Sequence, residues 1–201
     1  MDEIVHQAMA RWPNVPHCFG WLRLDARGQW RMRDERAQQL KLAGDPIRHP
    51  ALLAFIERNY AADDTGRWYF QNGPQRVYVD LEWMPHLLRT QPGADQNAPA
   101  LLLHTQGAVE QVDAAWMDER GRLYLRSDQI VAGVDDRDLA SLLPCLHPAD
   151  HADEDALLRW LEGSDDLTLS FIWKGQELAL QRIASDHLEE TFRFVANPRQ
   201  Y

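Results

Sequence analysis

Residues 66–82 read GRWYFQNGPQRVYVDLE, and this stretch decides the fold. It predicts a β-hairpin, because two runs rich in aromatic residues and valine meet at Asn72-Gly73, a dipeptide that accepts the positive φ values of a tight hairpin turn. In the second run, apolar Val77 and Val79 alternate with polar or aromatic neighbours. A strand directs alternate side chains to opposite faces, so we expect one face of the hairpin to be buried and the other to stay polar.

The same patterns extend outward from this hairpin in both directions. Helical spacing of apolar residues predicts helices over 2–12 and 49–60, and alternation predicts a hairpin over 21–33 that turns at 25–28. Residues 34–43 fit either a helix or a strand. Later in the chain we expect strands at 101–104, 109–117 and 123–126, helices at 135–143 and 156–162, a hairpin at 168–183, and a last strand in the tail 192–201.

Three of these elements occur twice in the same order. LDARGQWRMR resembles MDERGRLYLR, with Asp25, Gly28 and Arg33 matching Asp118, Gly121 and Arg126; ALLAFIERNY resembles ALLRWLEGSD; and WYFQNG resembles SFIWKG. A repeated order favours duplication over chance, although hairpins and amphipathic helices also resemble one another without common origin. The patterns predict an α+β protein of two similar antiparallel hairpin–helix–hairpin units that arose by internal duplication and pack together.

The boundary between the two units is expected in the polar, proline-containing segment RTQPGADQNAP. We therefore predict a first unit with its N-terminal helix at 1–90, a linker at 91–99, and a second unit at 100–201. The sequence leaves open whether these units form one domain or two.

Net charge and the distribution of apolar residues argue against some classes of binding partner. A formal net charge of −10 over 201 residues argues against nucleic acid and anionic membranes. The most apolar run, 98–103, is too short to cross a bilayer, and the acidic start does not fit a secretory signal. With two cysteines and no disulfide framework, we expect a cytoplasmic protein with reduced thiols.

The first half resembles an uncharacterised proteobacterial family, a domain of unknown function. The likeness lies in WPxVPxCxGWLxLDxRGxWRMR (12–33), GRWYFQNGPQRVYV (66–79) and FRFVANP near the end. A more distant likeness is to a repeat-containing family of unknown function that is suggested to act in signalling. It lies in Gly-x-Trp at 28–30, Gly-x-Pro-Ile at 44–47 and Ala51-Leu52. These resemblances imply a bacterial setting and no assigned activity.

The polar face of the first half is the best candidate site. If the leucines of the first hairpin face the core, arginine and aromatic side chains share the opposite face, and such side chains are enriched in binding surfaces. The alternative is a cross-strand array that only stabilises the sheet. The candidate ligand- or partner-binding residues are Trp21, Arg23, Arg31, Arg33, Tyr69, Arg76 and Tyr78.

Other reactive residues form weaker patterns. Cys145, His147, Asp150 and His151 carry zinc-type ligands within seven residues, but polar loops of this kind are usually solvated and no paired ligand motif supports a metal site. His17-Cys18 is an unlikely catalytic pair because neighbours on a strand point to opposite faces. We expect no cofactor and no metal.

No catalytic signature is recognisable, so the sequence favours a non-enzymatic regulatory module. It would bind a small anionic molecule or a protein partner through the polar face or the seam between the units. The alternative is a hydrolase-type enzyme whose site gathers His17, His104 or His147 with an acid from distant positions.

Overall fold

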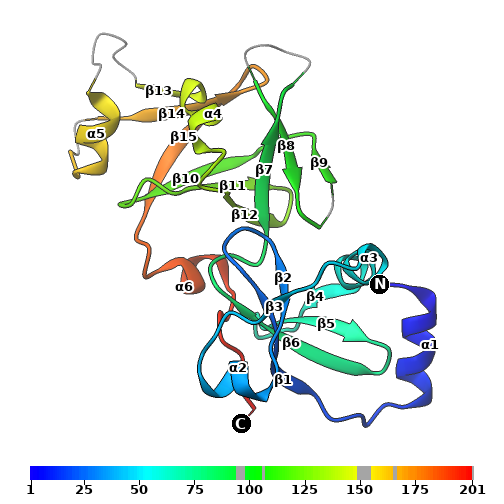
Figure 1. The fold of residues 1–201 in the computed structure, drawn as a ribbon. Helices are drawn as coiled ribbons and strands as arrows, with labels where there is room; N and C mark the ends of the chain where they lie inside the picture. Colours follow the sequence, from blue (N-terminus) through cyan, green and yellow to red (C-terminus); the bar gives the residue numbers. More distant parts are fainter. Residues whose placement is uncertain (94–97, 106, 149–154, 165–166, 201) are drawn as a thin grey trace. The chain divides into compact units, whose positions relative to one another are not determined.

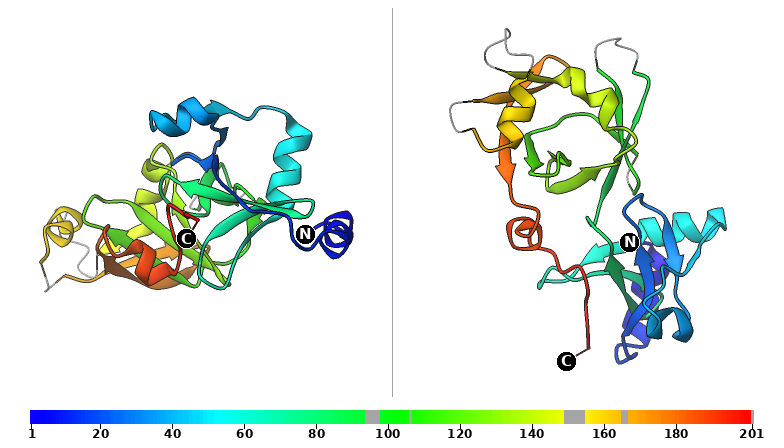
Figure 2. Two further views of the ribbon diagram at one scale, coloured as in Figure 1. Left: turned by 90° about the horizontal axis from the view of Figure 1, so that it is seen from below. Right: turned by 60° about the vertical axis from the view of Figure 1, so that its left-hand side comes forward.

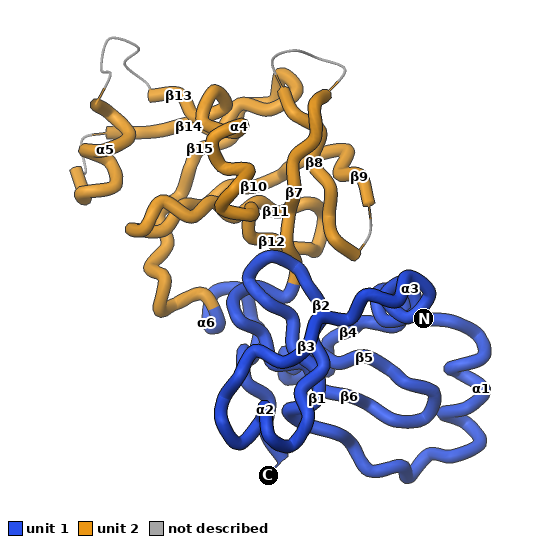
Figure 3. The backbone as a smooth tube through the Cα atoms, in the orientation of Figure 1, with its two compact units in different colours: residues 1–85, 189–201 blue, residues 86–188 orange. Residues whose placement is uncertain are grey.

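The structure is a computed structural model that describes residues 1–93, 98–105, 107–148, 155–164 and 167–200. The chain divides into two compact units (Figure 3). Unit 1 comprises Met1–Pro85 and Glu189–Tyr201, and unit 2 comprises His86–Leu188. Each unit is built on one β-sheet with short helices beside it (Figure 1), which makes this a mixed α+β fold as expected.

Unit 1 contains a six-stranded sheet in the order β3-β2-β1-β6-β5-β4. Its centre is a parallel pair, β1 with β6, and each of these strands has its own antiparallel hairpin partner, β2 and β5. The predicted hairpin over 66–82 is therefore confirmed. The strands are β1 (Cys18–Leu24), β2 (Trp30–Met32), β3 (Asp45–Pro46), β4 (Tyr60–Ala62), β5 (Trp68–Asn72) and β6 (Gln75–Leu81).

The N-terminal part of unit 1 contains the helices α1 (Glu3–Arg11), α2 (Glu35–Gln39) and α3 (Pro50–Arg58). The ambiguous stretch after the first hairpin becomes α2 because Asp34 caps it, accepting the Ala37 N–H at 2.7 Å. The core gathers apolar side chains of α1, α3 and the strands, including Val5, Leu24, Trp30, Ile56 and Val79.

The C-terminal segment also belongs to unit 1. The last helix, α6 (Leu188–Phe192), is followed by an extended chain (red in Figures 1 and 2). This chain is attached to the sheet where the Val195 N–H donates to the Gly66 carbonyl at 3.0 Å and the Leu81 N–H donates to the Ala196 carbonyl at 2.7 Å. The predicted tail strand is thus only an isolated bridge between Arg67 and Val195.

Unit 2 contains a nine-stranded sheet in the order β13-β14-β15-β10-β11-β12-β7-β8-β9. Here too a parallel pair, β10 with β15, is flanked by antiparallel hairpin partners, β11 and β14. The strands are β7 (Leu87–Gln91), β8 (Ala100–Leu103), β9 (Gly107–Val109), β10 (Ala114–Asp118), β11 (Leu123–Ser127), β12 (Ile130–Val134), β13 (Leu146–Pro148), β14 (Leu169–Trp173) and β15 (Gln176–Ile183).

The helical parts of unit 2 are α4 (Leu139–Leu142), a 3-10 turn η1 (Leu143–Cys145) and α5 (Ala156–Leu161). The sheet curves around α4 (Figure 2). One hydrophobic cluster joins Leu142 and Cys145 to Trp160 of α5 and to the buried strand residues. The helix predicted at 135–143 is shorter because Asp135 does not cap it and instead accepts the Arg137 N–H at 3.0 Å.

The two sheets share a strand order that was not fully apparent from the sequence. Strands β3-β2-β1-β6-β5-β4 of unit 1 correspond in order to β12-β11-β10-β15-β14-β13 of unit 2. The register agrees as well, since Leu22 pairs with Val79 and Ala115 pairs with Leu180. The proposed helix match differs from this order, because α3 lies between β3 and β4 whereas α5 lies between β13 and β14.

The predicted linker 91–99 also differs from the structure. Residues Leu88 to Gln91 of β7 pair with Leu103 to Ala100 of β8, so both flanks of the segment belong to one hairpin of unit 2. Its prolines and glycine serve a hairpin connection rather than a boundary. The predicted strand 109–117 is split, because β9 ends at Val109 and β10 begins at Ala114.

None of the helices in the described ranges combines the length and apolar character needed to cross a lipid bilayer.

Candidate functional site

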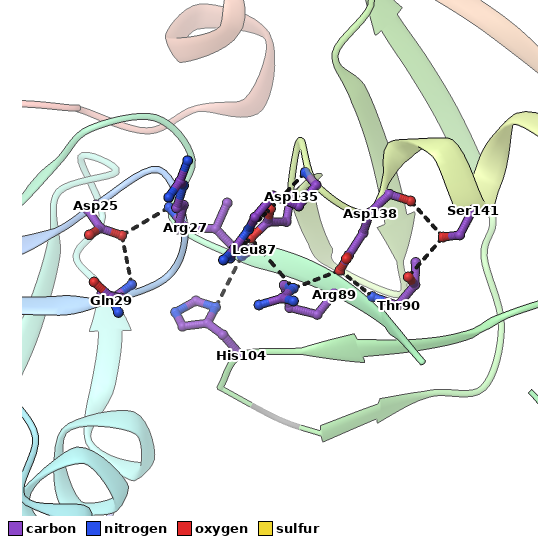
Figure 4. Close-up of polar contacts among 11 residues, drawn as sticks. Asp25, Arg27, Gln29, Leu87, Arg89, Thr90, His104, Asp135, Asp138 and Ser141 are labelled. Carbon is purple, nitrogen blue, oxygen red and sulfur yellow. Dashed lines mark hydrogen bonds and ion pairs between the residues drawn. The ribbon is translucent and has the colours of Figure 1, made fainter. Parts of the chain in front are cut away.

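Three hairpin loops share an arrangement built on an aspartate and a glycine three residues later. They begin at Asp25, Asp63 and Asp118. In each, the aspartate Oδ1 accepts the N–H groups two and four residues ahead, at distances between 2.9 and 3.1 Å. Each glycine has a φ between 75 and 80°, a conformation that suits glycine. Figure 4 shows the Asp25 loop with Arg27 and Gln29.

The second carboxylate oxygen of each loop aspartate is also bound. Asp25 Oδ2 accepts from Arg31 Nε at 2.7 Å, Asp63 Oδ2 from the Tyr78 hydroxyl at 2.9 Å, and Asp118 Oδ2 from the Tyr124 hydroxyl at 2.7 Å. Burial acts to raise the pKa of Asp63, but the hydrogen bonds around it outweigh burial and hold that pKa far below its usual range. All three carboxylates stabilise turns, and Asp63 is poorly suited to proton transfer.

A stack of aromatic rings and guanidinium groups lies on one face of the unit 1 sheet. Tyr69 and Tyr78 are cross-strand partners, with ring centroids 5.8 Å apart. Arg76 lies 4.5 Å over the Tyr69 ring, and Arg67 lies 4.9 Å over the Tyr78 ring. Phe19 stacks on Tyr78 with a centroid separation of 4.6 Å. The predicted residues Tyr69, Arg76 and Tyr78 therefore come together.

Phe19 also lines a polar cavity of about 220 Å³. We call this space the Arg33 cavity. Its walls are Phe19, Gly20, Arg33, Gln38, Asp80 and Arg199.

A cluster of three charged side chains forms part of the wall of the Arg33 cavity. Arg33 Nη1 lies 2.5 Å from Asp80 Oδ2, and these side chains are only 8% and 5% exposed. Arg199, from the C-terminal segment, donates to Asp80 Oδ1 at 2.9 Å and is 59% exposed. Of the described residues that line the cavity, these three are charged, and two guanidinium groups against one carboxylate leave a net charge of +1.

Arg33 retains an unused donor. Its Nε is buried and has no hydrogen-bond partner among the described residues. A buried polar group without a partner costs free energy, and a guanidinium matches the geometry of carboxylate and phosphate oxygens. The cavity thus offers an anion a guanidinium group with an unused donor, and a net positive charge.

Local structure explains why Arg33 is buried. Its own N–H donates to the Trp21 carbonyl at 2.8 Å, which extends the β1–β2 hairpin one residue beyond β2. The Gln38 side chain of α2 then donates through Nε2 to the Arg33 carbonyl at 3.2 Å. The outward position predicted for Arg33, Tyr69 and Tyr78 is wrong, because these residues are only 7%, 6% and 1% exposed. Gln38 and Arg199 lie beside Arg33 in the cavity wall. Phe19 and Arg67 pack on Tyr78, and Arg76 packs on Tyr69.

The other predicted residues lie apart from the cavity walls. Arg31 binds the Asp25 loop, and Arg23 Nη2 pairs with Glu82 at 2.7 Å. Trp21 remains 41% exposed. Four of the wall residues were not predicted to belong to a site: Phe19, Gly20, Gln38 and Arg199. Among these, only the arginine in the tail ANPRQY has the charge that a binding site for an anion requires.

Several polar side chains of unit 2 form hydrogen bonds that connect its own strands and helices. Arg89 Nε and the Thr90 N–H both donate to Asp138 Oδ2, at 2.7 and 2.8 Å, and tie β7 to the start of α4 (Figure 4). The hydrogen bonds from Arg137 lower the pKa of Asp135 to about 2. Asp135 is therefore ionised, and both carboxylates are paired within unit 2.

Two histidines lie close together where β7 and β8 meet, with ring centroids 5.9 Å apart. His104 Nδ1 accepts the Leu87 N–H at 3.1 Å (Figure 4), and His86 Nδ1 is 3.2 Å from the Thr105 hydroxyl. Burial lowers the pKa of His86 to about 3, with a contribution from His104, and burial lowers the pKa of His104 to about 4. Both rings are neutral near pH 7.

The histidines named for a dispersed enzyme site belong to different parts of the fold. His104 follows β8 and His147 lies in β13, near opposite edges of the unit 2 sheet. His17 belongs to unit 1, where its ring packs edge-on against Tyr78.

The candidate zinc ligands are only partly described. Asp150 and His151 lie outside the described residues, while Cys145 ends η1 and His147 lies in β13. Burial raises the pKa of the Cys145 thiol, which disfavours the thiolate that zinc requires. Within the described ranges, no group of three or more histidine, cysteine, aspartate or glutamate side chains is placed to hold a metal ion.

A larger cavity of about 380 Å³ in unit 2 is mainly apolar, with Trp160 and Met117 among its walls. Its charged groups are engaged locally. Arg182 Nη2 donates to the carbonyls of Trp160 and Ser164 at 2.8 and 2.6 Å, and Glu119 accepts from the Ser185 hydroxyl. This cavity therefore offers a ligand fewer unpaired polar groups than the Arg33 cavity does.

Comparison with solved structures shows the same fold in one protein. The chain is similar to a DUF1285 family protein from Silicibacter pomeroyi DSS-3, with a TM-score of 0.50 and 14% identity over 94% of this chain and 99% of that one. It also matches a DUF1285 family protein from Shewanella baltica OS155, with a TM-score of 0.38 and 13% identity over 60% of this chain and 88% of that one.

The chain matches none of the curated proteins with which it was compared. A family model described as "Protein of unknown function (DUF2946)" matches residues 1–199. This match spans nearly the whole chain, and the chain therefore belongs to that family of unknown function.

Proposed function

We propose that the protein is a non-enzymatic binding module whose unit 1 takes a small carboxylate-bearing molecule into the Arg33 cavity. The observation that carries the proposal is Arg33, which lines a cavity while its buried Nε has no hydrogen-bond partner among the described residues. A ligand carboxylate would accept from this group and offset the cost of leaving it unpaired.

Charge supports a ligand that carries a single carboxylate group. The chain as a whole has a formal charge of −10, yet the Arg33 cavity has a local charge of +1 from Arg33, Arg199 and Asp80. One ligand carboxylate group balances that charge. A polyanion would leave excess negative charge beside the buried Asp80.

The position of Arg199 links the cavity to the C-terminal segment. This segment is held to the sheet by the Val195 and Leu81 main-chain hydrogen bonds, and its arginine reaches Asp80. A ligand that recruits Arg199 would change how firmly the segment is attached. That coupling is a simple route from ligand binding to regulation.

The neighbouring stack extends the candidate surface. Phe19 belongs both to the cavity wall and to the stack on Tyr78, beside Tyr69 and Arg76. Planar rings with guanidinium groups suit contact with the remainder of an organic ligand. We include these residues in the proposed surface as secondary contacts.

We also infer that the two units arose by internal duplication. The shared strand order and the matching loops at Asp25 and Asp118 support this origin. It gives the experiments a matched control, because Arg33 and Arg126 each follow the loop aspartate by eight residues.

The test is calorimetric titration of the full chain with propionate. We expect a dissociation constant of roughly 1 mM, equivalent to about 4 kcal/mol and within the efficiency of such a small ligand. Arg33→Gln should abolish binding, while Arg126→Gln should leave it unchanged. Arg199→Gln, at an exposed position, tests the cavity without disturbing the core and should weaken binding.

Binding that survives both Arg33→Gln and Arg199→Gln would contradict the proposed site. A complete lack of binding to propionate, acetate and formate would contradict the ligand class.

A further inference from the structure

The Arg33 cavity presents hydrogen-bond acceptors as well as donors. Gln38 donates through Nε2 to the Arg33 carbonyl, so its amide is oriented and Oε1 is the opposite, accepting end. That Oε1 lies 2.7 Å from where a side chain at position 20 would place its Cβ. Gly20, with a φ of +78°, therefore leaves space that brings an amide oxygen to the cavity wall.

Asp80 supplies a second acceptor. Its two oxygens take one hydrogen bond each from Arg33 and Arg199. A carboxylate has about four lone-pair positions, so each oxygen can accept a further donor. A ligand that carried only a carboxylate would place its negative charge near Asp80 and be partly repelled.

The cavity is small and has one aromatic wall. A volume of about 220 Å³ admits a compact molecule, and the Phe19 ring is available to a short apolar side chain. The walls thus combine two guanidinium groups, a carboxylate, an amide oxygen and a ring.

We infer that the ligand is a small α-amino acid in its zwitterionic form. This inference rests on the proposed function and specifies its ligand class. The ligand carboxylate meets the guanidinium groups of Arg33 and Arg199, and the ligand ammonium meets Gln38 Oε1 and Asp80. One molecule then satisfies both the spare donors and the spare acceptors, and its ammonium offsets the repulsion by Asp80.

Three probes separate these contributions: L-alanine, propionate, which lacks the ammonium, and ethylamine, which lacks the carboxylate. In calorimetric titrations of the full chain we expect L-alanine to bind at least about tenfold more tightly than propionate, the worth of one charge-assisted hydrogen bond. Ethylamine should not bind measurably.

Asp80→Asn provides the decisive variant because it keeps the shape and removes the charge. L-Alanine should bind about tenfold more weakly to it, whereas propionate should bind more tightly, so that the order of the two ligands reverses. Arg126→Gln should change neither affinity. If Asp80→Asn does not fold, Gln38→Leu should weaken L-alanine binding while leaving propionate binding within about twofold.

Propionate binding as tightly as L-alanine, with both lost in Arg33→Gln, would overturn the amino acid assignment and leave the proposed carboxylate site intact. Failure of both ligands to bind would overturn the assignment together with the proposed function.

Discussion

Unit 1 and unit 2 share one strand order but differ in the residues at one equivalent position of the central parallel strands. In unit 1, Arg23 lies two residues before the loop aspartate. Its backbone partner on the neighbouring parallel strand is Asp80, which is buried. In unit 2, Trp116 occupies the equivalent position, and its backbone partner on the neighbouring parallel strand is Gln181, which is exposed. The shared strand order is therefore not sufficient to form the polar cavity. The feature that distinguishes unit 1 is the buried carboxylate of Asp80 on the central parallel pair of strands.

The two equivalent arginines behave accordingly. Arg33 has a side chain 8% exposed and is paired with Asp80, whereas Arg126 is 43% exposed and pairs with Asp113. Unit 2 instead buries the neutral His86–His104 pair. The stability of unit 1 therefore depends on a buried ion pair, whereas the stability of unit 2 depends on two buried histidines that remain uncharged.

Acid should distinguish the units most strongly. The pKa values of His86 and His104 are lowered from 6.5 to about 3 and about 4, so below pH 6.5 the unfolded chain takes up two protons that the folded unit 2 does not. Stability is thus greatest above pH 6.5 and falls toward pH 4, by about 5 kcal/mol between pH 6.5 and 4.5. Hydrogen exchange in β7 and β8, compared with β1 and β6, measures this loss.

A variant makes the acid prediction specific. His104→Asn keeps an oxygen to accept the Leu87 N–H and removes one titrating ring, so the loss with falling pH should be roughly halved. Equal acid sensitivity of β7–β8 and β1–β6 would show that the histidine pair is not its cause.

Removal of the equivalent arginines should have the next largest effect. Arg33→Gln leaves buried Asp80 with only the exposed Arg199, and we expect a loss of about 3 kcal/mol of unfolding free energy. Arg126→Gln breaks a surface pair and should cost less than about 1 kcal/mol. Urea unfolding measures both, and similar costs for the two variants would contradict the assigned burial.

The shared loops should give the smallest and most equal effects. Gly28 and Gly121 have φ values of +77° and +75°. An alanine at either position adopts a disfavoured backbone conformation, so Gly28→Ala and Gly121→Ala should each cost about 1–2 kcal/mol. Thermal unfolding measures the pair, and a cost confined to one unit would argue against equivalent loops.

Local patterns predicted the hairpins because turn residues and alternation act within a few positions. The hairpins at 21–33, 66–82 and 168–183 and the Asp25 and Asp118 turns follow from the residues themselves. The sequence also drew attention to Arg33, Tyr69, Arg76 and Tyr78, because an arginine and aromatic face is visible as alternation.

Long-range features had no comparable signal. The Asp80–Arg199 ion pair joins residues 119 positions apart, and the parallel pairing of β1 with β6 depends on the intervening chain. The hairpin β7–β8 resembled a linker because its connection is rich in proline and polar residues. The burial of Arg33 depends on α2, whose stretch was ambiguous in sequence.

The most direct test of the anion site is an NMR titration that follows the Arg33 Nε–H resonance, assigned from its absence in Arg33→Lys. The account predicts that propionate shifts this resonance along a saturating curve and leaves the Arg126 Nε–H resonance unmoved. An Arg33 Nε–H resonance that stays in place at saturating propionate, or that moves together with Arg126, would contradict the proposal that this cavity binds a carboxylate.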